Sequence, residues 1–345
     1  MTSRDIDEKF HYGFKACPVA KEQIADRVRL CDELGLDHFF CELYLDGIDI
    51  SSEKIKKKIL CHLPVLKSRC SIHVPVVDHK EIFFDPLNFK SGYIDNAADL
   101  ARRFEAHLIV LHRCWGFNSE IEWEEAEKRF NNWILEIAKD YEDLTFLIEN
   151  FGFVFRIING ESKSFMSPLD HFLPQEMVRF NEWISKNGIK NVYPFLDTAH
   201  ANLTLNLLKA WDIDPDYAKG FVHSSLHERI KEKTFYINCL EDYVSERIYP
   251  YFHVNDSCSL RPEALTSTWL DYFMSEGIVP GKGDIEWEPL LTKIHDLFDD
   301  VIIIMEVDMK NPVNGIEQKE GIEFIRRLIQ DLKRGKRLNE YHSHF

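Results

Sequence analysis

Short apolar runs alternate with longer amphipathic segments along most of the chain. The runs are rich in β-branched and aromatic residues, which is typical of strands buried on both faces in a parallel sheet. We predict eight such strands: Phe10–Lys15, His38–Leu43, Cys70–Val74, Leu108–His112, Thr145–Glu149, Val192–Asp197, Tyr251–Val254 and Val301–Glu306.

Between these runs, apolar residues recur at the three- and four-residue spacing of amphipathic helices. The predicted helices are Glu22–Leu34, Asp95–Phe104, Glu120–Lys139, Gln175–Lys186, Trp287–Phe298 and Gly321–Leu332. Eight strands that alternate with helices indicate an α/β fold with a parallel sheet, and closure into a (β/α)8 TIM barrel is favoured over an open sheet. No G-x-G-x-x-G follows the first strand, so the main sign of a dinucleotide-binding fold is missing.

The length of 345 residues fits a single barrel domain with enlarged loops. We expect the barrel to occupy residues 1–332, with insertions near the active-site mouth at about 207–249 and 257–280. Residues 333–345 are expected to form a polar C-terminal tail.

Net charge and composition argue against several classes of binding partner. The formal net charge of −16 argues against a protein that holds nucleic acid on a basic surface, or one that adheres to anionic membranes. No run approaches the roughly 20 apolar residues of a membrane helix, and the first residues lack a signal-peptide stretch. The eight cysteines form no C-x-x-C pair, which favours reduced core thiols. We expect a cytoplasmic protein with a small-molecule substrate, and a homodimer remains an option.

Polar residues stand where the predicted strands end. They are Glu42, His73, His112, Glu149, Asp197, His253 and Glu306, with His200 shortly after the sixth strand. Successive members are separated by 31 residues (42 to 73) up to 56 residues (197 to 253), the size of one strand–helix unit with its loops. Because the carboxyl ends of barrel strands meet at one mouth, these side chains are expected to converge.

Convergence of this kind predicts a metal site. A buried carboxylate is costly unless it is paired or bound to a cation. Glu149, Asp197 and Glu306 each end an apolar run, and with His253 they offer three carboxylates and one imidazole. That set suits one Mn²⁺, Mg²⁺, Co²⁺ or Zn²⁺ ion. Glu42 can also be interpreted as a salt-bridged structural acid, and His73 and His112 as core histidines with satisfied hydrogen bonds.

Seven short segments then point to a family. CSIHVPV, IVLHRCW, LIENFG, FLDTAHAN, YFHVNDS, GKGDIEW and IIIMEVD follow one another in order. Over roughly residues 10–330 the chain resembles the xylose-isomerase-like TIM barrel superfamily, which contains sugar-phosphate isomerases and epimerases as well as endonuclease IV. The resemblance implies that Glu149, Asp197, His253 and Glu306 are the metal ligands and that His200 contacts substrate.

The first functional hypothesis is a metal-dependent isomerase or epimerase, or a related dehydratase or lyase, acting on a small sugar or polyol derivative. Glu149 and Glu306 would exchange a proton next to a carbonyl as base and acid. Mn²⁺ is the favoured ion. The expected substrate-binding residues are His200, His112, His73, Arg261 and Lys282; for Arg261 and Lys282 a surface position is an equal interpretation.

Two alternatives stay open. The first is an endonuclease IV-like zinc phosphodiesterase acting on damaged DNA, in which Glu149 would bridge two ions and His73 and His112 would hold the second. The chain has no histidine between His253 and the glycine pair Gly281 and Gly283, where that family completes a third zinc site. The second alternative is a barrel without catalysis that serves as a binding partner, and the complete carboxylate set argues against it.

Overall fold

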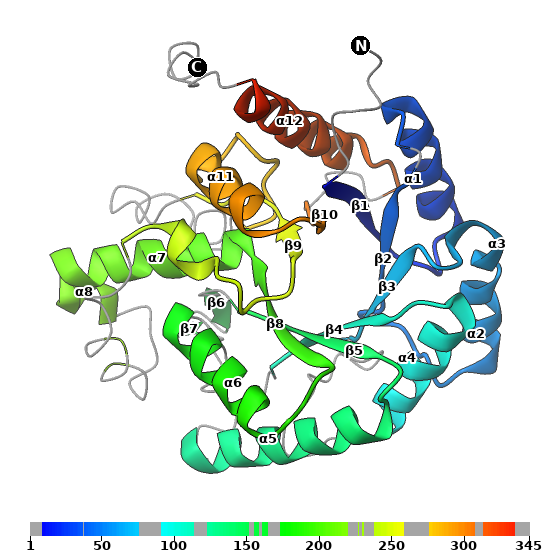
Figure 1. Ribbon diagram of the computed structural model, residues 1–345, viewed down its shortest axis with the longest axis horizontal. Coiled ribbons are helices and arrows are strands. Elements are labelled where there is room, and N and C mark those ends of the chain that lie inside the picture. The colour runs from blue at the N-terminus through cyan, green and yellow to red at the C-terminus, as the bar shows by residue number, and fades with distance from the viewer. Residues whose placement is uncertain are drawn as a thin grey trace.

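The protein is described by a computed structural model (Figure 1). It describes residues 9–36, 38–75, 91–113, 123–151, 155–158, 161–164, 173–219, 227, 230, 238–258, 276–307 and 313–334. Within these residues, no helix is long and apolar enough to cross a membrane.

Eight parallel strands close into a barrel in the order β1-β10-β9-β8-β5-β4-β3-β2. This confirms the predicted (β/α)8 fold. The strands are β1 (Phe10–Ala16), β2 (Phe40–Tyr44), β3 (Cys70–His73), β4 (Leu108–His112), β5 (Thr145–Glu149), β8 (Val192–Asp197), β9 (Tyr251–Val254) and β10 (Val301–Met305). Closure is made by β1 and β10, in which Phe10 pairs with Val301 and Phe14 with Met305.

Helices surround the barrel as an outer layer (Figure 1). They are α1 (Lys21–Leu34), α2 (Glu53–Leu60), α3 (Leu63–Leu66), α4 (Ser91–Phe104), α5 (Trp123–Asp140), α6 (Pro174–Lys186), α7 (Thr198–Ile213), α8 (Pro215–Lys219), α11 (Trp287–Leu297) and α12 (Ile316–Lys333), with a 3₁₀ turn, η5, at Leu240–Tyr243. The structure adds α2, α3, α7 and α8 to the predicted helices. Residues 207–213 belong to α7, so the excursion expected at 207–249 begins inside a helix.

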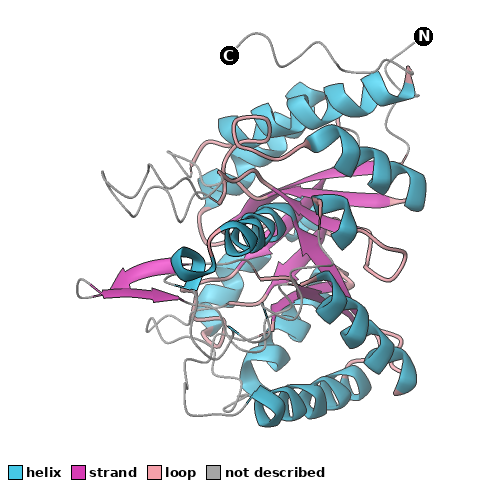
Figure 2. Cartoon of the chain, turned by 90° about the vertical axis from the view of Figure 1, so that its left-hand side faces the viewer, coloured by secondary structure: helices cyan, strands magenta, loops and turns pink. Residues whose placement is uncertain are grey.

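An antiparallel hairpin leaves the barrel after β5. Its strands are β6 (Phe155–Ile158) and β7 (Glu161–Ser164), and Phe155 pairs with Ser164. Figure 2 shows this hairpin projecting from the body of the molecule. It was not among the predicted elements.

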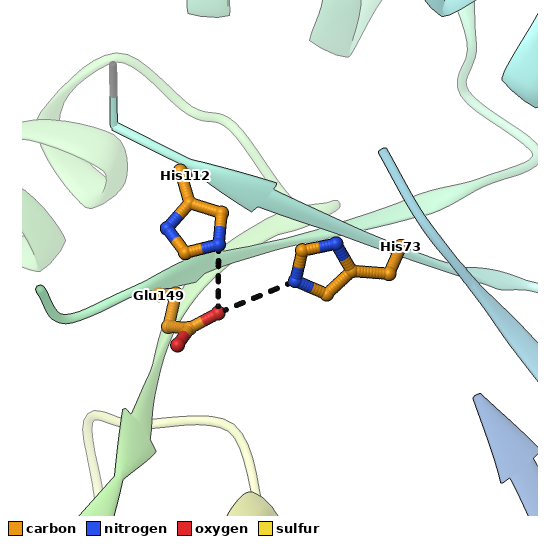
Figure 3. Close-up of side chains that lie close together, drawn as sticks. All are labelled: His73, His112 and Glu149. Atoms are coloured by element: carbon orange, nitrogen blue, oxygen red, sulfur yellow. Dashed lines mark ion pairs between the residues drawn. The ribbon is translucent and has the colours of Figure 1, made fainter. Parts of the chain in front are cut away.

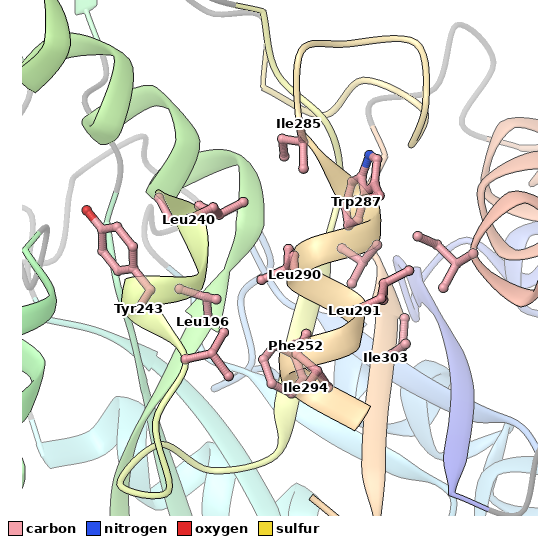
Figure 4. Close-up of a cluster of buried hydrophobic side chains, with 14 of the residues drawn as sticks. Leu196, Leu240, Tyr243, Phe252, Ile285, Trp287, Leu290, Leu291, Ile294 and Ile303 are labelled. Carbon is pink, nitrogen blue, oxygen red and sulfur yellow. The ribbon is translucent and has the colours of Figure 1, made fainter. Parts of the chain in front are cut away.

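Apolar side chains pack in two places, inside the barrel and between the barrel and the helices. The interior is filled by Leu108, Val110, Leu147, Phe195, Tyr251 and Ile304. In the outer layer, Leu290 and Ile294 of α11 lie against Phe252 of β9 and Ile303 of β10 (Figure 4). Full burial of a side chain of this size contributes about 1.5–3 kcal/mol.

One buried carboxylate fixes the loop between β9 and α11. Asp256 accepts hydrogen bonds from the backbone N–H groups of Ser257, Gly281 and Ile285 and from the indole N–H of Trp287, at 2.9, 2.9, 3.1 and 2.9 Å. The backbone of Asp256 also pairs with Ile278. Gly283 packs so closely that a Cβ there would lie 2.3 Å from Asp256 Oδ1. The helix itself has Glu286 as its N-cap.

Candidate metal centre

Each barrel strand carries an inward polar side chain at or near its carboxyl end. Side chains alternate along a strand, so the residue two positions after an interior apolar residue also faces inward. Interior Leu147, Phe195 and Ile304 are followed in this way by Glu149, Asp197 and Glu306. The same alternation applied to every strand gives Lys15, Tyr44, His73, His112, Glu149, Asp197, His253 and Glu306.

Four of these residues form a compact group. Glu149, Asp197, His253 and Glu306 each offer a ligand atom, and these atoms lie within 4.8 Å of one another. His253 Nδ1 is 2.5 Å from Glu306 Oε2, 3.5 Å from Glu149 Oε2 and 3.9 Å from Asp197 Oδ2. The structure therefore brings together the residues that sequence analysis proposed as ligands.

The inward atoms of this group suit a cation. Among the described residues, His253 Nδ1, Glu149 Oε2 and Glu306 Oε2 are buried and form ion-pair contacts with one another, but they lack a hydrogen-bond partner of regular geometry. Buried polar atoms normally have such partners. Three carboxylates and one imidazole are hard donors that suit Mn²⁺, Mg²⁺, Co²⁺ or Zn²⁺, so the residues present fit a divalent ion.

Neighbouring residues hold these ligands in place. His253 Nε2 donates to Glu42 Oε2 at 2.9 Å, and the hydroxyl of Tyr251 donates to the same oxygen at 2.7 Å. Because Glu42 accepts the proton on Nε2, Nδ1 is the ring atom that would bind a cation. Glu42 is thus part of the site, as the carboxylate that orients His253.

Asp197 is fixed in a different way. It is the N-cap of α7, where Oδ1 accepts from the backbone N–H of His200 at 2.7 Å. The side-chain amide of Asn255 donates to Oδ2 at 2.8 Å. The DTAH sequence therefore combines a candidate ligand with the start of a helix, and the same turn brings His200 to the mouth.

A second group shares Glu149 with the first and is drawn in Figure 3. His73, His112 and Glu149 also present ligand atoms within 4.8 Å of one another. Glu149 Oε2 is 3.6 Å from His73 Nε2 and 3.4 Å from His112 Nε2. Glu149 belongs to both groups, so the mouth could hold two ions that share this carboxylate.

The clustered charges shift several pKa values. Burial, together with the nearby carboxylates of Glu149 and Glu306, raises the pKa of Asp197 to about 7. Burial alone would lower the pKa of His253, but Glu306, Glu42 and Glu149 raise it well above its usual value. Burial lowers the pKa of His112 to about 4. Without a cation, the centre therefore holds protons that a metal would displace.

Two charged residues at the mouth were missed by sequence analysis. Lys15 contacts Glu306 Oε1 through its ammonium group. Glu276 reaches His200, whose Nε2 lies 3.1 Å from Glu276 Oε2, while His200 Nδ1 lies 3.2 Å from Glu149 Oε1. Alternation along β1 predicts an inward Lys15, whereas no sequence periodicity marks Glu276.

Three of the five predicted substrate-binding residues lie at the mouth. His73, His112 and His200 lie at the mouth, within 3.6 Å of Glu149. Lys282 is exposed and pairs with Glu320 of α12 at 2.7 Å. Arg261 falls outside the described residues.

Comparisons with known proteins identify the fold. No protein-family model and no curated protein matches the chain. A D-tagatose 3-epimerase-like protein is 14% identical, with a TM-score of 0.55 over 94% of this chain and 99% of its own. A xylose isomerase domain containing protein from Salmonella typhimurium LT2 is 14% identical, with a TM-score of 0.53 over 94% and 98%. The IOLI protein with a bound zinc atom is also 14% identical, with a TM-score of 0.50 over 95% and 99%. The chain has the fold of the xylose-isomerase-like TIM barrels.

Proposed function

We propose that the protein is a metal-dependent isomerase or epimerase, or a related dehydratase or lyase, that acts on a small sugar or polyol derivative. The observation that carries the proposal is the convergence of Glu149, Asp197, His253 and Glu306 on one centre at the barrel mouth. Among proteins of the same fold, one is named D-tagatose 3-epimerase-like and another contains a xylose isomerase domain.

The chain supplies both a cation site and groups that can move a proton. A bound divalent ion, Mn²⁺ by preference, would act as a Lewis acid on a substrate carbonyl and lower the cost of removing the neighbouring proton. Glu149 and Glu306 are the proposed base and acid, each with one oxygen directed to the centre.

Exposure distinguishes a buried side and an open side of the centre. Glu42, Glu149, Asp197 and His253 are at most 1% exposed and form the buried side, from which Glu149 is proposed to act as the base. The side chains of Lys15, Glu306, His112, His200 and Glu276 are partly exposed, at 21, 17, 11, 11 and 26%. A small polar molecule at the mouth would contact this second set.

Metal content gives the first test of the proposal. Protein purified without added metal is analysed for metal ions per chain, and about one manganese or cobalt ion supports the sugar hypothesis. The metal-loaded protein is then incubated with ketohexoses, D-tagatose among them, in D₂O, and carbon-bound deuterium is measured by NMR. The Glu306→Gln variant serves as the control. Protein that retains no divalent ion, even after loading, would refute the proposal.

A zinc phosphodiesterase of the endonuclease IV type is the second candidate. The second group, His73, His112 and Glu149, favours it, because paired ions that share a carboxylate suit phosphodiester cleavage. The net charge of −16 disfavours a nucleic-acid substrate. Two or more zinc ions per chain and cleavage of an abasic-site oligonucleotide would reverse the ranking.

A further inference from the structure

Lys15 is the one lysine or arginine among the eight inward residues that end the barrel strands. Gly13, two residues earlier, has its Cβ position 2.5 Å from Ile304 Cδ1, and Ile304 belongs to the barrel interior. Lys15 therefore faces the same interior at the mouth. Its backbone carbonyl accepts from Gln318 Nε2 at 3.1 Å, and the same amide donates to Met305 O at 3.0 Å. These bonds hold the ends of β1 and β10 in register.

The ammonium group of Lys15 is held at a fixed place in the mouth. It contacts Glu306 Oε1 on one side and lies 3.8 Å from the centre of the Tyr44 ring on another. The Tyr44 hydroxyl in turn donates to Asp46 Oδ2 at 2.6 Å. An ammonium has three N–H donors, so these contacts leave donor capacity for a further acceptor.

Exposure distinguishes Lys15 from the buried candidate ligands. Among the residues in the centre, His253, Glu149 and Asp197 are at most 1% exposed, whereas the Lys15 side chain is 21% exposed. Glu306, its partner, is 17% exposed. A molecule that reaches Glu306 from the mouth would therefore also meet the ammonium of Lys15.

We infer that Lys15 is a substrate-contacting residue that donates a hydrogen bond to the oxygen on which negative charge develops when a proton leaves the adjacent carbon. The inference rests on the proposed function and adds a role that the candidate ligands do not fill. A fixed donor aimed at a developing charge stabilises that state more than the ground state. The matching substrate is a hydroxy-carbonyl compound that presents neighbouring oxygens to the centre and to Lys15.

A purely structural role for Lys15 would give a different result when the residue is replaced. If Lys15 only neutralised Glu306, its removal would change the affinity for the cation and nothing else. If it contacts the substrate, its removal also weakens binding of a molecule that resembles the charged state. Cation affinity and mimic affinity are therefore measured separately.

The experiment uses the full chain loaded with Mn²⁺ and the variant Lys15→Met, which approximates the unbranched apolar stem of lysine and removes the ammonium group. Isothermal titration calorimetry measures Mn²⁺ affinity and then, at saturating Mn²⁺, the affinity for glycolohydroxamate, a small mimic of an enediolate. Lys15→Leu, which also lacks an N–H donor, gives the same comparison if the methionine variant does not fold, and Lys15→Arg tests rescue by charge. Lys9→Met is the matched control, because Lys9 immediately precedes β1 and pairs with Asp299 at 3.1 Å at the opposite end of the barrel.

We expect Lys15→Met to bind the mimic about 10- to 100-fold more weakly than the wild type, the range for one lost charge-assisted hydrogen bond. Lys15→Arg should recover part of this loss, and Lys9→Met should bind as the wild type does. Three results would each overturn the inference: equal mimic affinity in the wild type and Lys15→Met, a change confined to Mn²⁺ affinity, or wild type that takes up Mn²⁺ but does not bind the mimic. Failure of the wild type to bind any divalent ion would instead refute the proposed function, and the inference with it.

Discussion

Replacing Glu42 by glutamine tests whether the centre depends on the carboxylate that supports His253. The Glu42–His253 hydrogen bond is 2.9 Å long and both side chains are fully buried, so solvent does not screen it. Glutamine keeps an oxygen that can accept from His253 Nε2 but loses the charge. A hydrogen bond to a charged group contributes about 1.5–3 kcal/mol and a neutral one about 0.5–1.5 kcal/mol. The difference of about 1–2 kcal/mol corresponds to about 5- to 30-fold weaker Mn²⁺ binding.

Calorimetric titration of metal-free protein with Mn²⁺ measures this effect. Tyr251→Phe is the matched control, because it removes the other hydrogen bond to the same Glu42 oxygen and leaves His253 untouched. We expect the control to lose less affinity than Glu42→Gln. If Glu42→Gln binds Mn²⁺ as tightly as the wild type while both fold equally well, the orienting role of Glu42 is wrong.

Three further predictions concern the ligands and the loop after β9. The pKa of Asp197 is raised to about 7, and only the ionised carboxylate binds a cation, so Mn²⁺ affinity should fall by up to about tenfold per pH unit below pH 7 for this one proton. Calorimetric titrations in buffers of different ionisation enthalpy would show the release of the proton. An affinity that does not depend on pH would contradict the prediction. Glu306→Gln should abolish turnover and weaken Mn²⁺ binding by more than about 100-fold, because mutation of a residue that only supports a ligand already weakens metal binding by about 10- to 100-fold. Unchanged metal uptake would remove the basis of the proposed centre. Gly283→Ala should lower the free energy of unfolding, measured in urea, by about 1–3 kcal/mol, since the new Cβ would lie 2.3 Å from Asp256 Oδ1. Gly92→Ala is the control and should not destabilise the protein, because no atom lies within 4 Å of the new Cβ.

The barrel could be predicted from the sequence because its strands are buried on both faces. Their apolar runs stand out from the helices, and the predicted and observed strand ends differ by at most two residues, as between His38 and Phe40. The convergence of Glu149, Asp197, His253 and Glu306 follows from the same fact, since parallel strands in a barrel end at one mouth.

Other elements carried weaker signals. Helix α7 is buried on nearly all sides, so it lacks the polar face that marks a surface helix. Lys15 was hidden inside a run interpreted as a strand, although its alternation with Gly13 places it at the mouth. Glu276 lies in the expected insertion at 257–280, and only the contact with His200 reveals it. Aspartate is a common N-cap residue, but Asp284 is not the N-cap of α11, which begins at Trp287 after the N-cap Glu286.

The Asp256 carboxylate connects the residues that follow β9 to the residues that precede and begin α11. Ser257 on the incoming side and Gly281, Ile285 and Trp287 on the outgoing side are all tied to it. The described residues on the two sides of 259–275 are thus held together by one carboxylate, whatever the number of residues between them. Doubling the length of such a loop costs only about 0.6 kcal/mol in closure entropy. Insertions, deletions or exchanged segments in this stretch should leave Asp197, His253 and Glu306 where they are, which makes it a suitable position for engineering new specificity onto an unchanged centre.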